Sequence, residues 1–141
     1  MAKIVICEDS AYDTFQRYGD ILGSHEILIC CAQVGEFDRL NDGLNERGYP
    51  DQLEVRLGVP NVGTFRQIKP DLVFADGLGG RCKDVLTAAE AFFGTKDRAY
   101  LWTTSADLRD WARAQKYPIV EDLNHLVQII NGPSPSSITQ H

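Results

Sequence analysis

Short apolar runs alternate along this chain with segments that place apolar residues on one helical face. The runs are KIVIC at 3–7, EILICC at 26–31, DLVFA at 71–75, AYLWT at 99–103 and YPIV at 117–120. Continuous apolar runs of this length are typical of strands that are buried on both faces of a parallel sheet. We therefore expect five parallel strands at these positions.

The segments between the runs have the spacing and the caps of amphipathic helices. Helices are expected after Ser10, over 36–47, over 83–93, after Ser105 and after Asp122. Serine and aspartate are favoured N-cap residues, because their side-chain oxygens accept hydrogen bonds from the first turn. Strands that alternate with helices in this way predict an α/β fold with a doubly wound, five-stranded parallel sheet.

Two neighbouring stretches fit more than one structure. The stretch LEVRLGVP at 53–60 fits either an extra short strand or a loop, and residues 61–69 fit one or two helical turns. The tail at 132–141 is rich in proline and serine, and we expect it to be disordered. Residues 1–131 are assigned to one domain.

Composition and charge narrow the classes of function. A chain of 141 residues that is 43% hydrophobic fits one domain with a core of its own. The formal net charge of −6 argues against a nucleic-acid partner. No run of about 18 apolar residues is present and the N-terminus is charged, so we expect a soluble, cytoplasmic protein without a membrane partner. The four cysteines, which show no CxxC pairing, are expected to be buried, reduced thiols (Cys7, Cys30, Cys31 and Cys82).

Acidic and hydroxyl side chains follow several of the predicted strands. They are Glu8-Asp9, Asp76, Thr103-Thr104 and Glu121-Asp122. In doubly wound sheets the functional crevice lies outside the carboxyl ends of the strands. Carboxylates that meet there need a cation to remain ionised together, and their hard oxygens suit Mg²⁺. Asp76 is then expected to be exposed, as a nucleophile, a metal ligand or both.

Simpler interpretations of the same residues stay open. Acids that precede helices stabilise the positive end of the helix dipole, so Asp9 and Asp122 fit helix caps. The glycine-rich GLGG at 77–80 fits a tight turn, or a loop whose backbone N–H groups cradle a phosphate.

Three stretches resemble the receiver domain of two-component response regulators: KIVICEDS, KPDLVFADG and AYLWTTSAD. The resemblance implies a flavodoxin-like (βα)5 receiver fold with an insertion between the second and third strands. It also implies a Mg²⁺ site at Glu8, Asp9 and Asp76 that is assisted by the backbone of Leu78. Asp76 would be the phosphoacceptor, and Thr103 the hydroxyl that follows the phosphoryl group.

One position departs from the family pattern. Where receiver domains carry a lysine after the fifth strand, this chain has Glu121.

Three functions follow as hypotheses. The first is a single-domain, non-enzymatic phosphoacceptor that takes its phosphoryl group from a sensor histidine kinase or phosphotransfer protein, and acts through an output protein or by homodimerisation. The second is a phosphorylation-independent pseudo-receiver that binds proteins. The third is a Mg²⁺-dependent phosphatase or nucleotide-binding protein.

Overall fold

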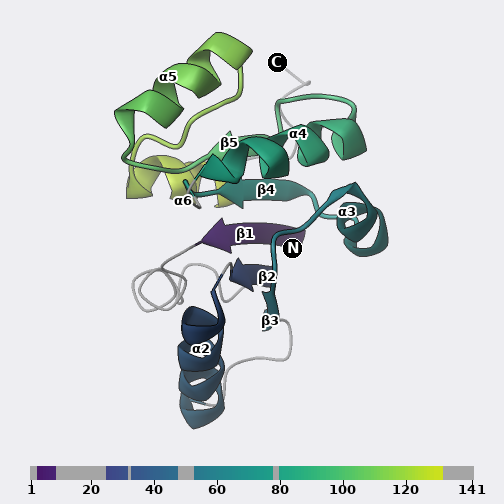
Figure 1. Ribbon diagram of the computed structural model, residues 1–141, viewed down its shortest axis with the longest axis vertical. Coiled ribbons are helices and arrows are strands. Elements are labelled where there is room, and N and C mark those ends of the chain that lie inside the picture. The colour runs from purple at the N-terminus through teal and green to yellow at the C-terminus, as the bar shows by residue number, and fades with distance from the viewer. Residues whose placement is uncertain (1–2, 9–24, 32, 48–52, 78–79, 132–141) are drawn as a thin grey trace.

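One parallel sheet forms the centre of the molecule (Figure 1). The computed structural model describes residues 3–8, 25–31, 33–47, 53–77 and 80–131. Its strands are β1 (Lys3–Glu8), β2 (Glu26–Cys31), β3 (Leu53–Leu57), β4 (Leu72–Ala75) and β5 (Ala99–Leu101). All neighbouring pairs are parallel, in the order β3-β2-β1-β4-β5. The predicted α/β fold with a five-stranded parallel sheet is confirmed, in a flavodoxin-like arrangement.

Helices cover both faces of this sheet. They are α2 (Val34–Arg47), α3 (Val62–Ile68), α4 (Cys82–Phe93), α5 (Ala106–Gln115) and α6 (Leu123–Asn131). Buried residues of α3, α4 and α5 pack with one set of strand residues, which includes Val5 and Val73. Residues of α2 and α6 pack with the alternate set, which includes Ile4 and Phe74. Because successive strand side chains point to opposite faces, the two clusters are the two layers of a doubly wound fold.

The membership of the sheet differs from the prediction. The sheet includes β3, at a position that the sequence left ambiguous. The predicted strand at 117–120 is not a member of the sheet, and it forms only a single parallel bridge, between Leu101 and Ile119. The segment between β2 and β4, in which the resemblance implied an insertion, contains α2, β3 and α3. Asn61 and Thr64 form a capping box that starts α3. Residues 62–68 are therefore helical, with Asn61 and Lys69 as the caps.

The segment at 117–120 forms no further ladder with β5 because Pro118, whose carbonyl faces β5, has no N–H to extend the pairing. The residues at its two ends contact other elements. The N–H of Tyr117 donates to the carbonyl of Ala112 at the end of α5, at 2.9 Å. The N–H of Glu121 donates to Nδ1 of His125, at 3.0 Å. Towards β5, the Pro118 carbonyl accepts from the N–H of Leu101 at 3.0 Å, and the N–H of Val120 donates to the carbonyl of Leu101 at 2.9 Å.

Other predictions can be checked on the described residues. All four cysteines are free and buried, as expected. Ser105 Oγ accepts a hydrogen bond from the N–H of Leu108 at 3.4 Å, and Asp122 Oδ1 accepts one from the N–H of His125 at 2.8 Å, so both predicted caps are confirmed. The predicted helix after Ser10 and the tail at 132–141 lie outside the described residues.

No helix in the described ranges is long and apolar enough to cross a membrane.

Candidate functional site

The carboxyl ends of β1 and β4 meet where the winding of the sheet reverses. The chain adds β2 and β3 on one side of β1, and then crosses to add β4 and β5 on the other. Cys7 is paired with Ala75, and the N–H of Asp76 donates to the carbonyl of Cys7 at 2.9 Å. Glu8 is the last residue of β1 and Asp76 directly follows β4, so the two acids lie at the ends of adjacent strands. This is the switch point, where doubly wound folds bind their ligands.

The two acids have different surroundings. Glu8 is buried, with 6% of its surface exposed, and it is paired with Cys31 of β2. Burial raises the pKa of the Cys31 thiol to about 11, and the charge of Glu8 adds to this rise. Asp76 is partly buried, which corrects the expectation that it is exposed. Its charge adds to the effect of burial in raising the pKa of Cys82 at the start of α4.

Thr103 lies close to the residue that follows Asp76. The N–H of Trp102 donates to the carbonyl of Ala75 at 2.8 Å, which continues the pairing of β4 and β5 to the sheet edge. A Cβ atom built on Gly77 would lie 3.4 Å from Thr103 Oγ1 and 3.2 Å from Leu108 Cδ1. The absence of a side chain at Gly77 therefore lets Thr103 and the start of α5 approach the end of β4. Glu8, Asp76 and Thr103 thus lie at or just after the carboxyl ends of the neighbouring strands β1, β4 and β5.

Gly77 and Gly80 lie between the end of β4 and the start of α4. The carbonyl of Gly77 accepts hydrogen bonds from the N–H of Gly80 at 2.8 Å and from that of Cys82 at 3.4 Å. Gly80 has φ of 94°, a conformation that favours glycine. The tight-turn interpretation of these glycines is thus supported by geometry. Leu78, the predicted backbone ligand, lies outside the described residues, as does Asp9.

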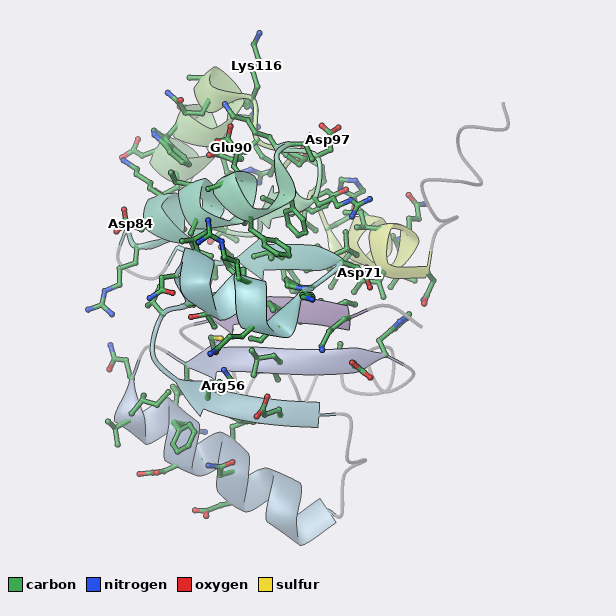
Figure 2. All side chains as sticks on the ribbon, turned by 90° about the vertical axis from the view of Figure 1, so that its right-hand side faces the viewer. Arg56, Asp71, Asp84, Glu90, Asp97 and Lys116 are labelled. Carbon is green, nitrogen blue, oxygen red and sulfur yellow. The ribbon has the colours of Figure 1, made fainter. Side chains whose placement is uncertain are left out.

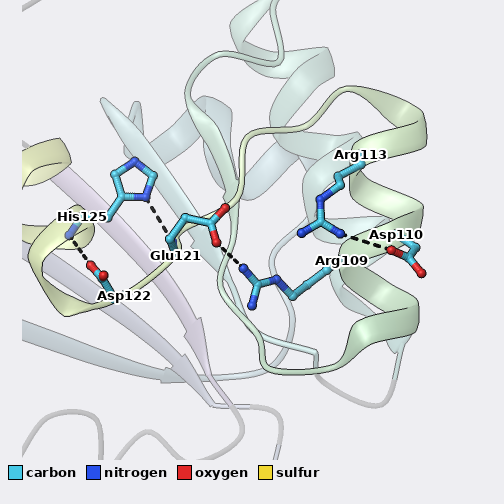
Figure 3. A network of polar contacts seen from close by, with 6 residues as sticks. All are labelled: Arg109, Asp110, Arg113, Glu121, Asp122 and His125. Atoms are coloured by element: carbon cyan, nitrogen blue, oxygen red, sulfur yellow. Dashed lines mark hydrogen bonds and ion pairs between the residues drawn. The ribbon is translucent and has the colours of Figure 1, made fainter.

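Glu121 forms an ion pair that sequence reasoning missed (Figure 3). Arg109, on α5, donates through its Nη2 to Glu121 Oε2. The side chain of Arg109 is 23% exposed and that of Glu121 is 59% exposed. The two residues are twelve positions apart on different elements, so no local pattern marks the pair. The acid at the predicted lysine position therefore has a cationic partner.

Arg109 is also held in a partly desolvated position. Its Nε is buried and has no hydrogen-bond partner within the described ranges. The same helix presents Leu108 towards Gly77. Since Glu121 directly follows the segment that bridges to β5, Arg109 brings a positive charge to the carboxyl side of the sheet, on its β5 flank.

The lysine nearest in sequence, Lys116, does not replace the missing cation. It is exposed and ends α5 in a left-handed conformation, with φ of 65°. Its neighbour Tyr117 lies under Lys96 Nζ, 4.9 Å from the ring centroid, and Lys96 precedes β5. Figure 2 shows Lys116 at the far tip of the molecule, above the strands. Lys116 is therefore near the amino end of β5, opposite to the acids.

The donor set can be compared with what Mg²⁺ requires. No group of three or more His, Cys, Asp or Glu side chains that could hold a metal ion occurs within the described residues. Glu8 and Asp76 are the two predicted ligands whose positions are described. One or two carboxylates with water molecules are a normal ligand set for Mg²⁺, so these two residues fit the ion as a partial site.

In comparisons with known proteins, no family model matches the chain, and no curated protein matches it significantly.

Proposed function

We propose that this chain is a single-domain, receiver-like signalling protein whose phosphoacceptor is Asp76. The observation that carries the proposal is the hydrogen bond from the Asp76 N–H to the Cys7 carbonyl, which seats Asp76 beside Glu8 at the switch point. The closeness of Gly77 to Thr103 supports the same assignment. The proposed phosphoryl transfer to Asp76 is inferred from the resemblance of the strand-end motifs to receiver domains.

In this proposal an oxygen of the Asp76 carboxylate attacks the phosphorus of a phosphohistidine in line. A P–O bond forms as the P–N bond breaks, and the imidazole leaves. Glu8 and Asp76, together with Asp9 and the backbone of Leu78, would hold Mg²⁺, which offsets negative charge on the phosphoryl group. Thr103 would donate its hydroxyl to a phosphoryl oxygen. Its movement would carry the signal to β5 and α5.

The partners follow from this chemistry. The donor would be a sensor histidine kinase or a phosphotransfer protein, and the output a separate protein that recognises the changed surface. We place the protein in the cytoplasm, as a phosphoprotein of a phosphorelay that is not itself an enzyme. The net charge of −6 supports partners other than nucleic acid.

A second candidate, a phosphorylation-independent pseudo-receiver, is favoured by a specific observation. Glu121 occupies the position of the receiver lysine and forms an ion pair with Arg109, which neutralises the charge of the arginine. With that pair intact, the candidate site has an extra carboxylate where a phosphoryl group would need a cation. A Mg²⁺-dependent phosphatase or nucleotide-binding role has less support, because the N–H groups of Gly80 and Cys82 donate to the carbonyl of Gly77.

Tryptophan fluorescence can test the proposal, because Trp102 continues the β5 pairing beside the end of β4. The protein, carrying Trp111→Phe to isolate Trp102, is titrated with Mg²⁺ and then with beryllofluoride, a phosphoryl mimic. We expect saturable changes at both steps. Asp76→Asn should abolish them, because it removes the charge at constant volume.

The matched control is Asp97→Asn, which removes an exposed acid at the amino end of β5 (Figure 2). This variant should titrate like the parent. A response to Mg²⁺ without one to beryllofluoride would support the pseudo-receiver instead. Equal responses in Asp76→Asn and the parent, or no response to either reagent when calorimetry also detects no binding, would reject the shared site.

A further inference from the structure

The outer edge of the sheet is formed by β3. Among the described strands, β3 pairs only with β2. Figure 2 shows β3 at the margin of the sheet, with Arg56 labelled on it. A strand edge of this kind presents backbone N–H and C=O groups that can pair with another chain.

The backbone groups that face outward can be identified. The N–H of Gly58 donates to the carbonyl of Cys31 in β2, at 2.8 Å. Because backbone groups alternate in direction along a strand, those of Glu54 and Arg56 also point to β2. The N–H and C=O of Val55 and Leu57 therefore point away from β2, to the outer side of β3, beyond which Figure 2 shows α2.

We propose that a second copy of this chain docks on β3, with the two β3 strands antiparallel about a two-fold axis at Val55. In this register Val55 lies opposite Val55 of the partner subunit, and the outward groups of both residues form a mutually hydrogen-bonded pair. Such an interface uses the same surface on both copies, as two-fold symmetry requires. The two sheets would join into one.

The charges of β3 are self-complementary in this register. Glu54 lies opposite Arg56 of the partner subunit, and Arg56 lies opposite Glu54 of the partner subunit. Within one copy Arg56 Nη2 is 3.5 Å from Glu54 Oε2, and the two side chains are 43% and 58% exposed. Pairing would turn this exposed ion pair into a square of alternating charges, in which every nearest neighbour across the strands is of opposite sign.

Apolar exposure adds to the argument. Among the described residues, the exposed large hydrophobic side chains are Val34, at 59%, and Leu57, at 48%. Leu57 ends β3, and Val34 begins the helix that follows β2, so both lie towards the carboxyl end of this flank. A partner on β3 would cover Leu57. A five-residue strand pair is small for a stable interface, so we expect a reversible dimer.

Charge reversal with rescue tests the register. Sedimentation of the native chain from about 5 µM to about 500 µM should show a dimer fraction that rises with concentration. Glu54→Arg and Arg56→Glu should each weaken self-association about tenfold, because each places like charges opposite one another at both pairs. An equimolar mixture of the two variants should form a heterodimer, and the double variant E54R/R56E should dimerise like the native chain.

A backbone variant provides an independent test. Val55→Pro removes the outward N–H at the two-fold axis but no hydrogen bond to β2, and proline is tolerated on the outer side of an edge strand. We expect a monomer with an unchanged far-ultraviolet circular dichroism spectrum. If Val55→Pro does not fold, the charge-reversal pair decides the outcome alone.

Two results would overturn the proposal. One is a native chain that stays monomeric over the whole concentration range, which would leave the β3 edge to a different partner. The other is self-association that neither single charge reversal weakens, which would place the contact elsewhere. The experiment does not use Asp76, so its outcome is separate from that of the proposed phosphoacceptor function.

Discussion

Arg109 and Glu121 show how one tertiary contact changes the interpretation of a residue. From the sequence, Glu121 is an acid where receiver domains have a lysine. In the structure it is paired with an arginine that is three-quarters buried. The pair adds no net charge near the candidate site and supplies no cation that is free to bind phosphate. Asp76, Glu8 and Thr103 could be found from the strand-end pattern alone, but Arg109 could not.

A charge change at Glu121 should therefore change anion affinity. We expect Glu121→Lys to increase beryllofluoride affinity about tenfold in the presence of Mg²⁺, because it exchanges a repulsive for an attractive charge and releases Arg109 from its partner. Glu121→Gln, which only removes charge, should give a smaller increase. Fluorescence titration measures both. Unchanged affinity in the two variants would show that charge at this position does not limit binding.

At the scale of elements, local signals placed the helices better than they placed the edges of the sheet. The cap at Ser105 and the cap at Asp122 were read directly from residue type and spacing, and both form the expected hydrogen bonds. Pro118, which has no N–H for a strand ladder, is a local signal against 117–120; the rest of the choice could not be made locally, since both segments are short and apolar in part. It depended on which neighbouring strand offered free backbone groups.

The capping box of α3 gives a test at this scale. Asn61 Oδ1 accepts from the N–H of Thr64 at 3.0 Å, and Thr64 Oγ1 accepts from the N–H of Asn61 at 3.2 Å. We expect Asn61→Ala to lower the free energy of unfolding by about 1 kcal/mol, measured by urea denaturation. Asn61→Asp keeps an acceptor and should stay close to the native value. Equal losses in both variants would mean that the cap is not the source of the stability.

At the scale of the whole molecule, buried acidic groups make the fold sensitive to alkaline pH. Between Cys7 and Cys30, a shared hydrogen bond raises the pKa of Cys7 and lowers that of Cys30, so the two shifts oppose each other. Burial raises the pKa of Cys31 to about 11, and it also raises the pKa of Cys82 and Tyr117. The folded state holds the protons of Cys31, Cys82 and Tyr117 more tightly than the unfolded state. Their contribution is therefore complete below the unfolded pKa and is lost as pH rises through the folded pKa.

We accordingly expect the free energy of unfolding to decrease between about pH 8.5 and about pH 11, where unfolded thiols ionise before folded ones. Urea denaturation at a series of pH values measures this slope. Cys31→Ala removes one of the responsible thiols and should make the slope shallower, whatever its effect at neutral pH. A slope identical to that of the native chain would show that Cys31 has the same pKa in the folded and unfolded states.

What the sequence by itself determined are the features that depend on near neighbours and on burial: the alternation of strands and helices, the caps, the buried cysteines and the acids that follow strands. These follow from periodicity and residue type, which are local. The tertiary structure alone decided that β3 forms the edge of the sheet, that 117–120 contributes a single bridge, and that Arg109 meets Glu121. Each of these depends on hydrogen bonds or charges between residues distant in the chain, and their geometry exists only once the sheet has assembled.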